Sequence, residues 1–284
     1  MNGLRASARR PFASSSTITR NWQRYYAAPA QQAYLEQKDN VAVLYLNRPE
    51  AKNAISRQLL KEFHGCLKQL DRSSRVLIIS GTKPGAFCAG ADLAERRTMS
   101  TAEVNQFLVN LRAAIRNLEQ VDIPTIAAID GPALGGGLEL ALACDLRVAG
   151  AQATKIGLPE TKLGIIPGAG GTQRLVRLLG ISKAKELIFT GRALSPKEAH
   201  AFGVVDHVAE SGLSKAFELA EEMKTGAPLA LRAAKLAVSR AVDLSLEAGL
   251  DFERACYQPL LSTKDRLEAL AAFKAKRKPN FTGE

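Results

Sequence analysis

Two glutamates in the middle of the chain adjoin glycine-rich segments and lie in largely apolar sequence. Glu139 ends the segment at 131–139 (GPALGGGLE), and Glu160 directly precedes a second glycine-rich segment that ends at Gly171. A carboxylate is seldom placed in apolar surroundings unless it is paired or functional. The two segments therefore predict backbone donors that face two acid/base groups across a small cleft.

The glycines before Glu139 could serve as an anion site. Gly135, Gly136 and Gly137 precede a helix predicted at 138–144. The N-terminus of a helix offers unpaired N–H groups and a partial positive charge, and glycine lets a ligand approach the backbone. A developing oxyanion could be held there. A phosphate-type site or a close strand–helix contact would also explain the glycines.

A third segment, at 85–92 (GAFCAGAD), follows a predicted strand and its loop. A turn of small residues can present backbone N–H groups, but it can equally be a tight connection between a strand and a helix. Taken alone, Glu160 could also be a solvated loop carboxylate. The glycines at 168–171 are expected to begin a helix and shape the pocket rather than touch reacting atoms.

The elements that must position these residues alternate along the chain. Apolar runs and helical spacing predict strands and helices in turn, and this order favours a parallel sheet with helical crossovers. Capping boxes at Ser100 and Ser195 mark two helix starts. The predicted strands are 41–46, 76–79, 125–129, 146–148 and 204–208, and the helices are 56–70, 100–120, 138–144 and much of 212–276. We predict an α/β core followed by a helical C-terminal part.

Composition is that of a folded protein with a substantial core, since 46% of the 284 residues are hydrophobic. The longest apolar stretch, 125–151, is interrupted by three acidic residues, so no membrane span is expected. The four cysteines are scattered, with no spacing that suits zinc, and the three histidines do not supply the missing ligands. We expect free thiols and no metal site.

The N-terminal segment has a different composition. Before Glu36 there are five arginines, many serines and threonines, and no acid. This pattern is typical of a transit peptide, most often mitochondrial, and a disordered basic tail is the alternative. We therefore assign residues 1–30 to a disordered or cleaved transit peptide. Removing its five arginines lowers the formal net charge from +11 to +6, which suits an anionic ligand and is also compatible with nucleic acid.

In combination, these motifs strongly resemble the enoyl-CoA hydratase/isomerase (crotonase) superfamily over about residues 34–284. The matching pieces are 47–54 (NRPEAKNA), 87–92 (FCAGAD), 135–141 (GGGLELA), 144–145 (CD) and 159–174 (PETKLGIIPGAGGTQR). The resemblance implies an α/β fold of the crotonase (ClpP-like) type, a spiral of repeated ββα units with a helical C-terminal trimerisation part. The core would span 31–210, and the helical region 211–284.

The resemblance also implies roles for the site residues. The thioester oxygen of an acyl-CoA would lie between the N–H groups of Ala91 and Gly136. Glu139 would mainly activate water and Glu160 would protonate Cα, with no metal or redox cofactor, acyl-CoA being the substrate. Isomerases of the family generally lack the first glutamate, so the presence of both favours a hydratase.

Substrate contacts and assembly follow from the same matching. The expected substrate and CoA contacts are Lys52, Ala89, Gly90, Asp92, Gly135, Phe273 and Lys276, the last two sometimes reaching a neighbouring subunit. Lys276 could instead belong to a solvated basic tail. The family commonly forms homotrimers that pair into homohexamers, so an oligomer is expected.

The acyl group is less well specified. Segments 138–145, 184–189 and 263–268 favour the methylglutaconyl-CoA hydratases of leucine degradation, with general short-chain hydratases of fatty-acid β-oxidation and biosynthetic crotonases as alternatives. Arg96, Arg97 or another cation could pair with a distal carboxylate. RNA binding is a less favoured hypothesis, because the matching face of the first helix holds Arg57, Lys61 and Gly65 and so lacks a third positive charge.

Overall fold

The computed structural model describes residues 31–82, 85 and 87–284. The predicted transit peptide at 1–30 lies outside the described residues, as does Ala86 of the third glycine-rich segment. None of the helices in the described part is long and apolar enough to cross a membrane.

A six-stranded sheet forms the centre of the fold, in the order β1-β2-β3-β4-β6-β8. The β1/β2 pair is antiparallel and every other neighbouring pair is parallel, as the alternation of strands and helices predicted. The strands are β1 (Ala33–Lys38), β2 (Val41–Leu46), β3 (Val76–Gly81), β4 (Thr125–Ile129), β6 (Leu146–Gly150) and β8 (His207–Ala209). The sequence did not predict β1.

The last strand begins later than predicted. The expected strand at 204–208 is instead β8, at His207–Ala209. The N–H groups of Val204 and Val205 donate to the Ala199 carbonyl and so close the preceding helix, at 2.8 and 3.3 Å. These N–H groups cannot also serve a strand ladder, and the strand begins only after them.

The four central strands, β2, β3, β4 and β6, are buried on both faces, which explains why they read as continuous apolar runs. Alternate side chains point to opposite faces. Val41, Val43 and Ile78 belong to a cluster with Ala216 and Ala220 of α8 (Gly212–Met223). Their neighbours in sequence, such as Leu44 and Leu77, belong to the larger core under the helices of the opposite face.

The larger core is covered by the helices that carry the site. Both predicted capping boxes are confirmed, with Ser100 and Ser195 as the N-cap residues. The helices are α1 (Arg57–Lys68), α3 (Thr101–Glu119), α4 (Gly136–Leu142), α5 (Gly171–Leu179), α6 (Ile181–Thr190) and α7 (Pro196–Phe202). Short elements complete this part: η1 (Pro49–Ala51), α2 (Leu93–Arg96), β5 (Ala133–Leu134), β7 (Ile156–Gly157) and η2 (Glu160–Leu163). Strands β5 and β7 form a small parallel sheet of their own.

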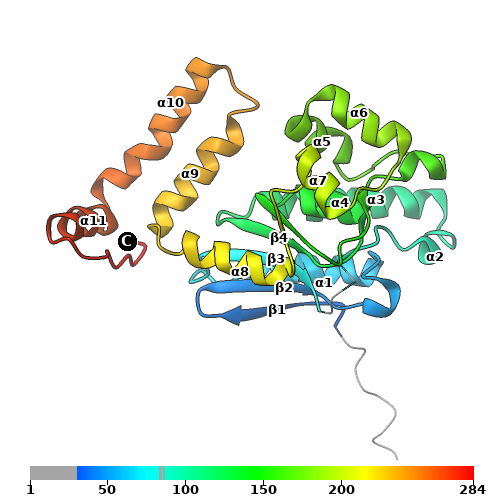
Figure 1. Cartoon of the computed structure of the whole chain (residues 1–284), viewed down its shortest axis with the longest axis horizontal. Coiled ribbons are helices and arrows are strands. Elements are labelled where there is room, and N and C mark those ends of the chain that lie inside the picture. The colour runs from blue at the N-terminus through cyan, green and yellow to red at the C-terminus, as the bar shows by residue number, and fades with distance from the viewer. Residues whose placement is uncertain (1–30, 83–84, 86) are drawn as a thin grey trace, which may run out of the picture. The chain divides into compact units, whose positions relative to one another are not determined.

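The C-terminal part is helical, as predicted. After α8 come α9 (Pro228–Arg240), α10 (Leu246–Tyr257), η3 (Gln258–Ser262) and α11 (Lys264–Lys274). In Figure 1, α9, α10 and α11 (orange to red) lie at the left of the view, and α5 and α6 lie at its right. Lys235 holds α9 to the α/β part, since its Nζ lies 2.7 Å from Oδ2 of Asp145 and donates to the Ile123 carbonyl.

Candidate active site

Glu139 lies in α4, a short helix whose seven residues are all buried. Glu139 is only 2% exposed, so its carboxylate is shielded from bulk water. The helix begins at Gly136, two residues before the predicted start, because Gly135 takes the N-cap position with a φ of 51°. The Glu139 N–H donates to the Gly135 carbonyl at 2.9 Å, which places the glutamate one turn after the glycines.

Two backbone donors hold one oxygen of this carboxylate. Oε1 of Glu139 accepts from the N–H of Ala169 at 2.8 Å and from that of Gly171 at 2.7 Å. Burial raises the pKa of Glu139, and the two N–H groups and the positive charge of Arg174 oppose that rise. The glycines at 168–171 begin α5 as expected, but they also hold a site carboxylate, which the sequence did not predict.

Glu160 is in a different environment, at the start of η2. It is 7% exposed, and its Oε2 is buried with no hydrogen-bond partner among the described residues. Burial raises the pKa of Glu160 to about 7; its own backbone N–H opposes the rise and the charge of Glu139 adds to it. A buried carboxyl with one oxygen left without a donor favours its neutral form.

The two glutamates are therefore poised for opposite roles. Glu139 is stabilised as a carboxylate by two N–H groups, while Glu160 keeps its proton up to about neutral pH. Burial raises the pKa of both groups, but only Glu139 has two N–H donors from another segment that favour its charged form, and such unequal surroundings are typical of acid/base pairs. The pair can take a proton from one reacting atom and give a proton to another.

Ala91 and Gly136 present two backbone N–H groups next to each other. A Cβ atom at Gly136 would lie 3.8 Å from the Ala91 nitrogen, and one at Gly90 would lie 3.5 Å from the Gly136 nitrogen. Within the described part of the chain, neither N–H donates a hydrogen bond. The neighbouring groups are occupied, because the Gly90 carbonyl accepts from Ile55 at 2.7 Å. Two adjacent free donors suit an oxygen that gains negative charge.

The three glycines before Glu139 have three different functions in the structure. A Cβ at Gly135 would lie 3.0 Å from Oε1 of Glu160, so this glycine makes room for the second carboxylate. Gly136 provides a free N–H. A Cβ at Gly137 would lie 2.1 Å from the Cys88 carbonyl oxygen, so this position is a close packing contact of the kind considered as the alternative.

The expected CoA contacts fall into two groups. Lys52 has a left-handed conformation, and its carbonyl accepts from the Ala89 N–H at 3.0 Å, which joins the two segments directly. Asp92 caps α2 and pairs with Arg48 at 2.6 Å, so its carboxylate already has partners. Phe273 and Lys276 lie on or just after α11, which Figure 1 shows apart from α2 and α4. Within this chain they are not brought to the glutamates.

Other cations considered from the sequence have identifiable surroundings. Arg96 lies over the Phe107 ring, 6.0 Å from its centroid, and Arg97 is exposed. Arg57 pairs with Glu95 at 3.0 Å and with Glu103 at 3.4 Å. These two acids reduce the positive charge of the α1 face on which the RNA hypothesis depends.

Residues 36–284 match the family model described as enoyl-CoA hydratase/isomerase. The chain belongs to this family. The match covers Glu139, Glu160, the free N–H groups of Ala91 and Gly136, and the C-terminal helices. The fold expected from the resemblance is confirmed.

Several members of the family are similar over most of their length. The chain is 54% identical to the enoyl-CoA isomerase/hydratase fer4 of Mycosarcoma maydis, over 89% of this chain and 98% of that protein. It is 50% identical to the mitochondrial methylglutaconyl-CoA hydratase of Homo sapiens, over 88% and 76%. Among solved structures, an enoyl-CoA hydratase from Bacillus anthracis superposes with a TM-score of 0.87 at 45% identity, over 89% and 100%.

Proposed function

We propose that this enzyme adds water across the 2,3 double bond of an enoyl-CoA thioester, with 3-methylglutaconyl-CoA as substrate and 3-hydroxy-3-methylglutaryl-CoA as product. The observation that carries the proposal is the unequal pair of glutamates beside two free N–H groups. Oε1 of Glu139 is held by two N–H donors from the 169–171 turn, while Oε2 of Glu160 is buried with no hydrogen-bond partner among the described residues.

In the proposed reaction, the thioester oxygen accepts hydrogen bonds from the N–H groups of Ala91 and Gly136. Glu139 takes a proton from water as the water oxygen bonds to C3, and the electrons of the double bond move onto the thioester oxygen. The enolate then takes a proton at C2 from Glu160. Loss of one such oxyanion donor typically raises the barrier by about 3–4 kcal/mol. This chemistry needs no metal or redox cofactor.

The acyl group is proposed from the relatives. Half of the aligned residues are identical to the human methylglutaconyl-CoA hydratase, which favours a branched acyl chain with a distal carboxylate. A second candidate is a hydratase or isomerase for another enoyl-CoA, favoured by the 54% identity to the fungal isomerase/hydratase. The third candidate is a general hydratase of short-chain enoyl-CoA thioesters. Leucine degradation would be the pathway only if 3-methylglutaconyl-CoA is the substrate.

The test compares kcat/KM for 3-methylglutaconyl-CoA, 3-methylcrotonyl-CoA and crotonyl-CoA on one enzyme preparation. The proposal expects 3-methylglutaconyl-CoA to be preferred, and 3-methylcrotonyl-CoA, which lacks the distal carboxylate, to be poorer. A clear preference for crotonyl-CoA would contradict the assigned substrate while leaving the reaction class intact. Isomerisation of a 3-enoyl-CoA faster than any hydration would favour the second candidate.

We further propose that the enzyme works in the mitochondrial matrix. The human relative is named as mitochondrial, and residues 1–30 have the composition of a transit peptide. Residues 1–35 fused to a fluorescent reporter should direct it to mitochondria, and the fusion with Arg5, Arg9, Arg10, Arg20 and Arg24 changed to Gln should not. A reporter that stays in the cytosol with the native segment would contradict this.

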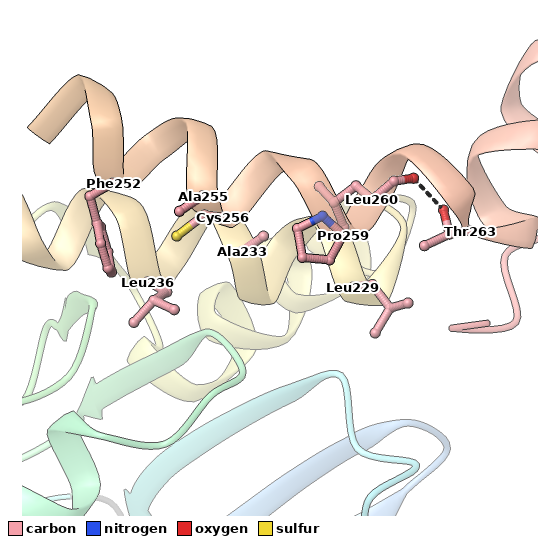
Figure 2. Close-up of a pocket in the computed structure, with 9 residues that line it drawn as sticks. All are labelled: Leu229, Ala233, Leu236, Phe252, Ala255, Cys256, Pro259, Leu260 and Thr263. Atoms are coloured by element: carbon pink, nitrogen blue, oxygen red, sulfur yellow. Dashed lines mark hydrogen bonds between the residues drawn. The ribbon is translucent and has the colours of Figure 1, made fainter.

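Homotrimers that pair into hexamers are proposed as the assembly. The C-terminal helices expose large apolar side chains, among them Phe273 at 87%, Leu246 at 76% and Val238 at 72%. An apolar cavity of about 370 Å³ lies between α9, α10 and η3. Figure 2 shows residues that line it, among them Leu236, Phe252 and Leu260. We assign these surfaces to assembly, which would bring Phe273 and Lys276 to the CoA of a neighbouring copy. A monomer in light scattering at micromolar concentration would contradict the proposal.

RNA binding is not proposed as a function, because Arg57 is paired with two acids and Gly65 adds no charge. Salt-dependent RNA affinity in a filter-binding assay would contradict this.

A further inference from the structure

Arg174 lies in the first turn of α5 with its guanidinium group under the turn that holds Glu139. The side chain is 15% exposed. Its Nη1 donates to the Ala169 carbonyl at 2.9 Å. Its Nε and Nη2 donate to the two carboxylate oxygens of Glu119, at 2.8 and 2.7 Å. This two-point pairing fixes the plane of the guanidinium, because a carboxylate matches the fork of donors on arginine.

The turn at 169–171 is built around this guanidinium. Ala169 is held on both sides, since its N–H donates to Glu139 and its carbonyl accepts from Arg174. Gly170 has a φ of 111°, and a Cβ there would lie 2.1 Å from Nη1 of Arg174. The neighbouring N–H, that of Gly171, is the second donor to Glu139. Moving the guanidinium would therefore release the turn whose two N–H groups hold the carboxylate.

We infer that Arg174 is a positioning residue for the reaction: with Glu119 it holds the 169–171 turn, so that the N–H groups of Ala169 and Gly171 aim Glu139 at water. This inference rests on the proposed role of Glu139 as the base. Arg174 acts through the turn and through its charge, because its three hydrogen-bonding nitrogens are directed to Ala169 and Glu119. A misplacement of about 1 Å at a reacting group can cost on the order of 100-fold in rate.

The charge of Arg174 supports the same role. It opposes the rise in the Glu139 pKa that burial causes. The charged groups that face Glu139 are Arg174 on α5 and Glu160 on η2, with Glu119 of α3 behind Arg174. Removing the positive charge should raise the pKa of Glu139, so the base would be lost at a higher pH than in the native enzyme.

The experiment compares Arg174→Gln, Arg174→Lys and Arg177→Gln as full-length enzymes, using whichever enoyl-CoA the native enzyme hydrates best. Arg177 is the matched control, because it lies on the same helix and pairs with Asp243 at 3.2 Å away from the turn. R174Q should lower kcat by about 10- to 100-fold with KM little changed. The acidic limb of its kcat profile should move to higher pH. R174K, which keeps the charge, should leave the limb near its native position, and R177Q should match the native enzyme.

A separate variant guards against loss of folding. Glu119→Gln preserves the size of the side chain that pairs with Arg174, and it should lower kcat less than R174Q does. The thermal stability of every variant is recorded. If R174Q folds and matches R177Q in kcat and in its acidic limb, the inference is overturned. If R174Q is too unstable to assay, native kcat in E119Q overturns it instead. A native enzyme that hydrates no enoyl-CoA would overturn the proposed function itself. That outcome is distinct from a failure of the inference about Arg174, which requires an active native enzyme.

Discussion

The backbone N–H of Gly171 lies 2.7 Å from Oε1 of Glu139 and donates a hydrogen bond to it. The donor comes from the first residue of one helix, and the acceptor comes from the buried interior of another. Helix N-termini stabilise negative charge, so this contact opposes the rise in the pKa of Glu139 that burial causes. The other oxygen, Oε2, is left available for water in the proposed mechanism.

Gly135 should tolerate no side chain. Its φ is 51°, and a Cβ would lie 3.0 Å from Oε1 of Glu160. We expect Gly135→Ala to lower kcat/KM by about 100-fold or more, because it displaces the carboxyl group and strains the helix start. Gly65→Ala is the control: it lies inside α1 with no atom within 4 Å of the added Cβ, and it should add up to about 1 kcal/mol of stability with native activity. Native activity in G135A would contradict the assignment.

The catalytic rate should depend on the proton of Glu160. Its pKa is raised to about 7 by burial, so kcat/KM for hydration should fall as the pH rises above about 7, where the free enzyme loses this acid. The check is a profile from pH 5 to 9, with the binding of butyryl-CoA, which has no double bond to hydrate, measured alongside as the control. A kcat/KM that stays level to pH 9 would argue against Glu160 as the acid.

Stability should depend on the same proton. The folded chain keeps it up to about pH 7, whereas the unfolded chain releases it near 4.5. The stability that the proton contributes is fully present below pH 4.5 and is lost as the pH rises through 7. Relative to Glu160→Gln, the native free energy of unfolding should therefore fall by roughly 2–3 kcal/mol between pH 5 and 8, measured by urea denaturation.

Glu268 provides the comparison for that experiment. The pKa of Glu268 is lowered to about 2, and the largest cause is the hydrogen bond from the Arg277 side chain. A lowered pKa contributes stability above 4.5 that is lost as the pH falls toward 2, so the Glu268→Gln difference should stay flat from pH 5 to 8. If E160Q shows the same flat difference, Glu160 does not hold its proton as described.

Lys52 is expected to contact the phosphates of CoA. Lys52→Gln should raise KM about tenfold with little change in kcat, since a hydrogen bond to a charged group contributes about 1.5–3 kcal/mol. Exposed Lys61 on α1 provides the control variant Lys61→Gln. Steady-state kinetics with an N-acetylcysteamine thioester, which lacks the phosphates, should show no effect of K52Q. An equal loss with both substrates would place Lys52 elsewhere.

Features set by local sequence were predictable. The capping boxes at Ser100 and Ser195, and strands such as β2 and β4, follow from patterns of a few residues, and the structure has them where expected. The two glutamates and the glycines before Glu139 were found because carboxylates in apolar sequence are rare.

Features set by long-range contacts were not predictable. Strand β1 has a half-exposed, charged sequence, and it is a strand because it pairs along its whole length with β2. The partner of Arg174, Glu119, lies 55 residues away, and the donors to Glu139 are 30 and 32 residues away. The local pattern of 168–171 predicts a helix start, but it does not show that the N–H groups there also bind a carboxylate from another helix.

The division of roles between the two glutamates is tested most directly by proton exchange. Butyryl-CoA has no double bond to hydrate, but its C2 proton can exchange with deuterium through an enolate held by Ala91 and Gly136. In deuterated buffer, Glu139→Gln should lose at least about 100-fold in hydration yet still exchange that proton, whereas Glu160→Gln should lose both. Exchange that survives in E160Q and disappears in E139Q would contradict the account.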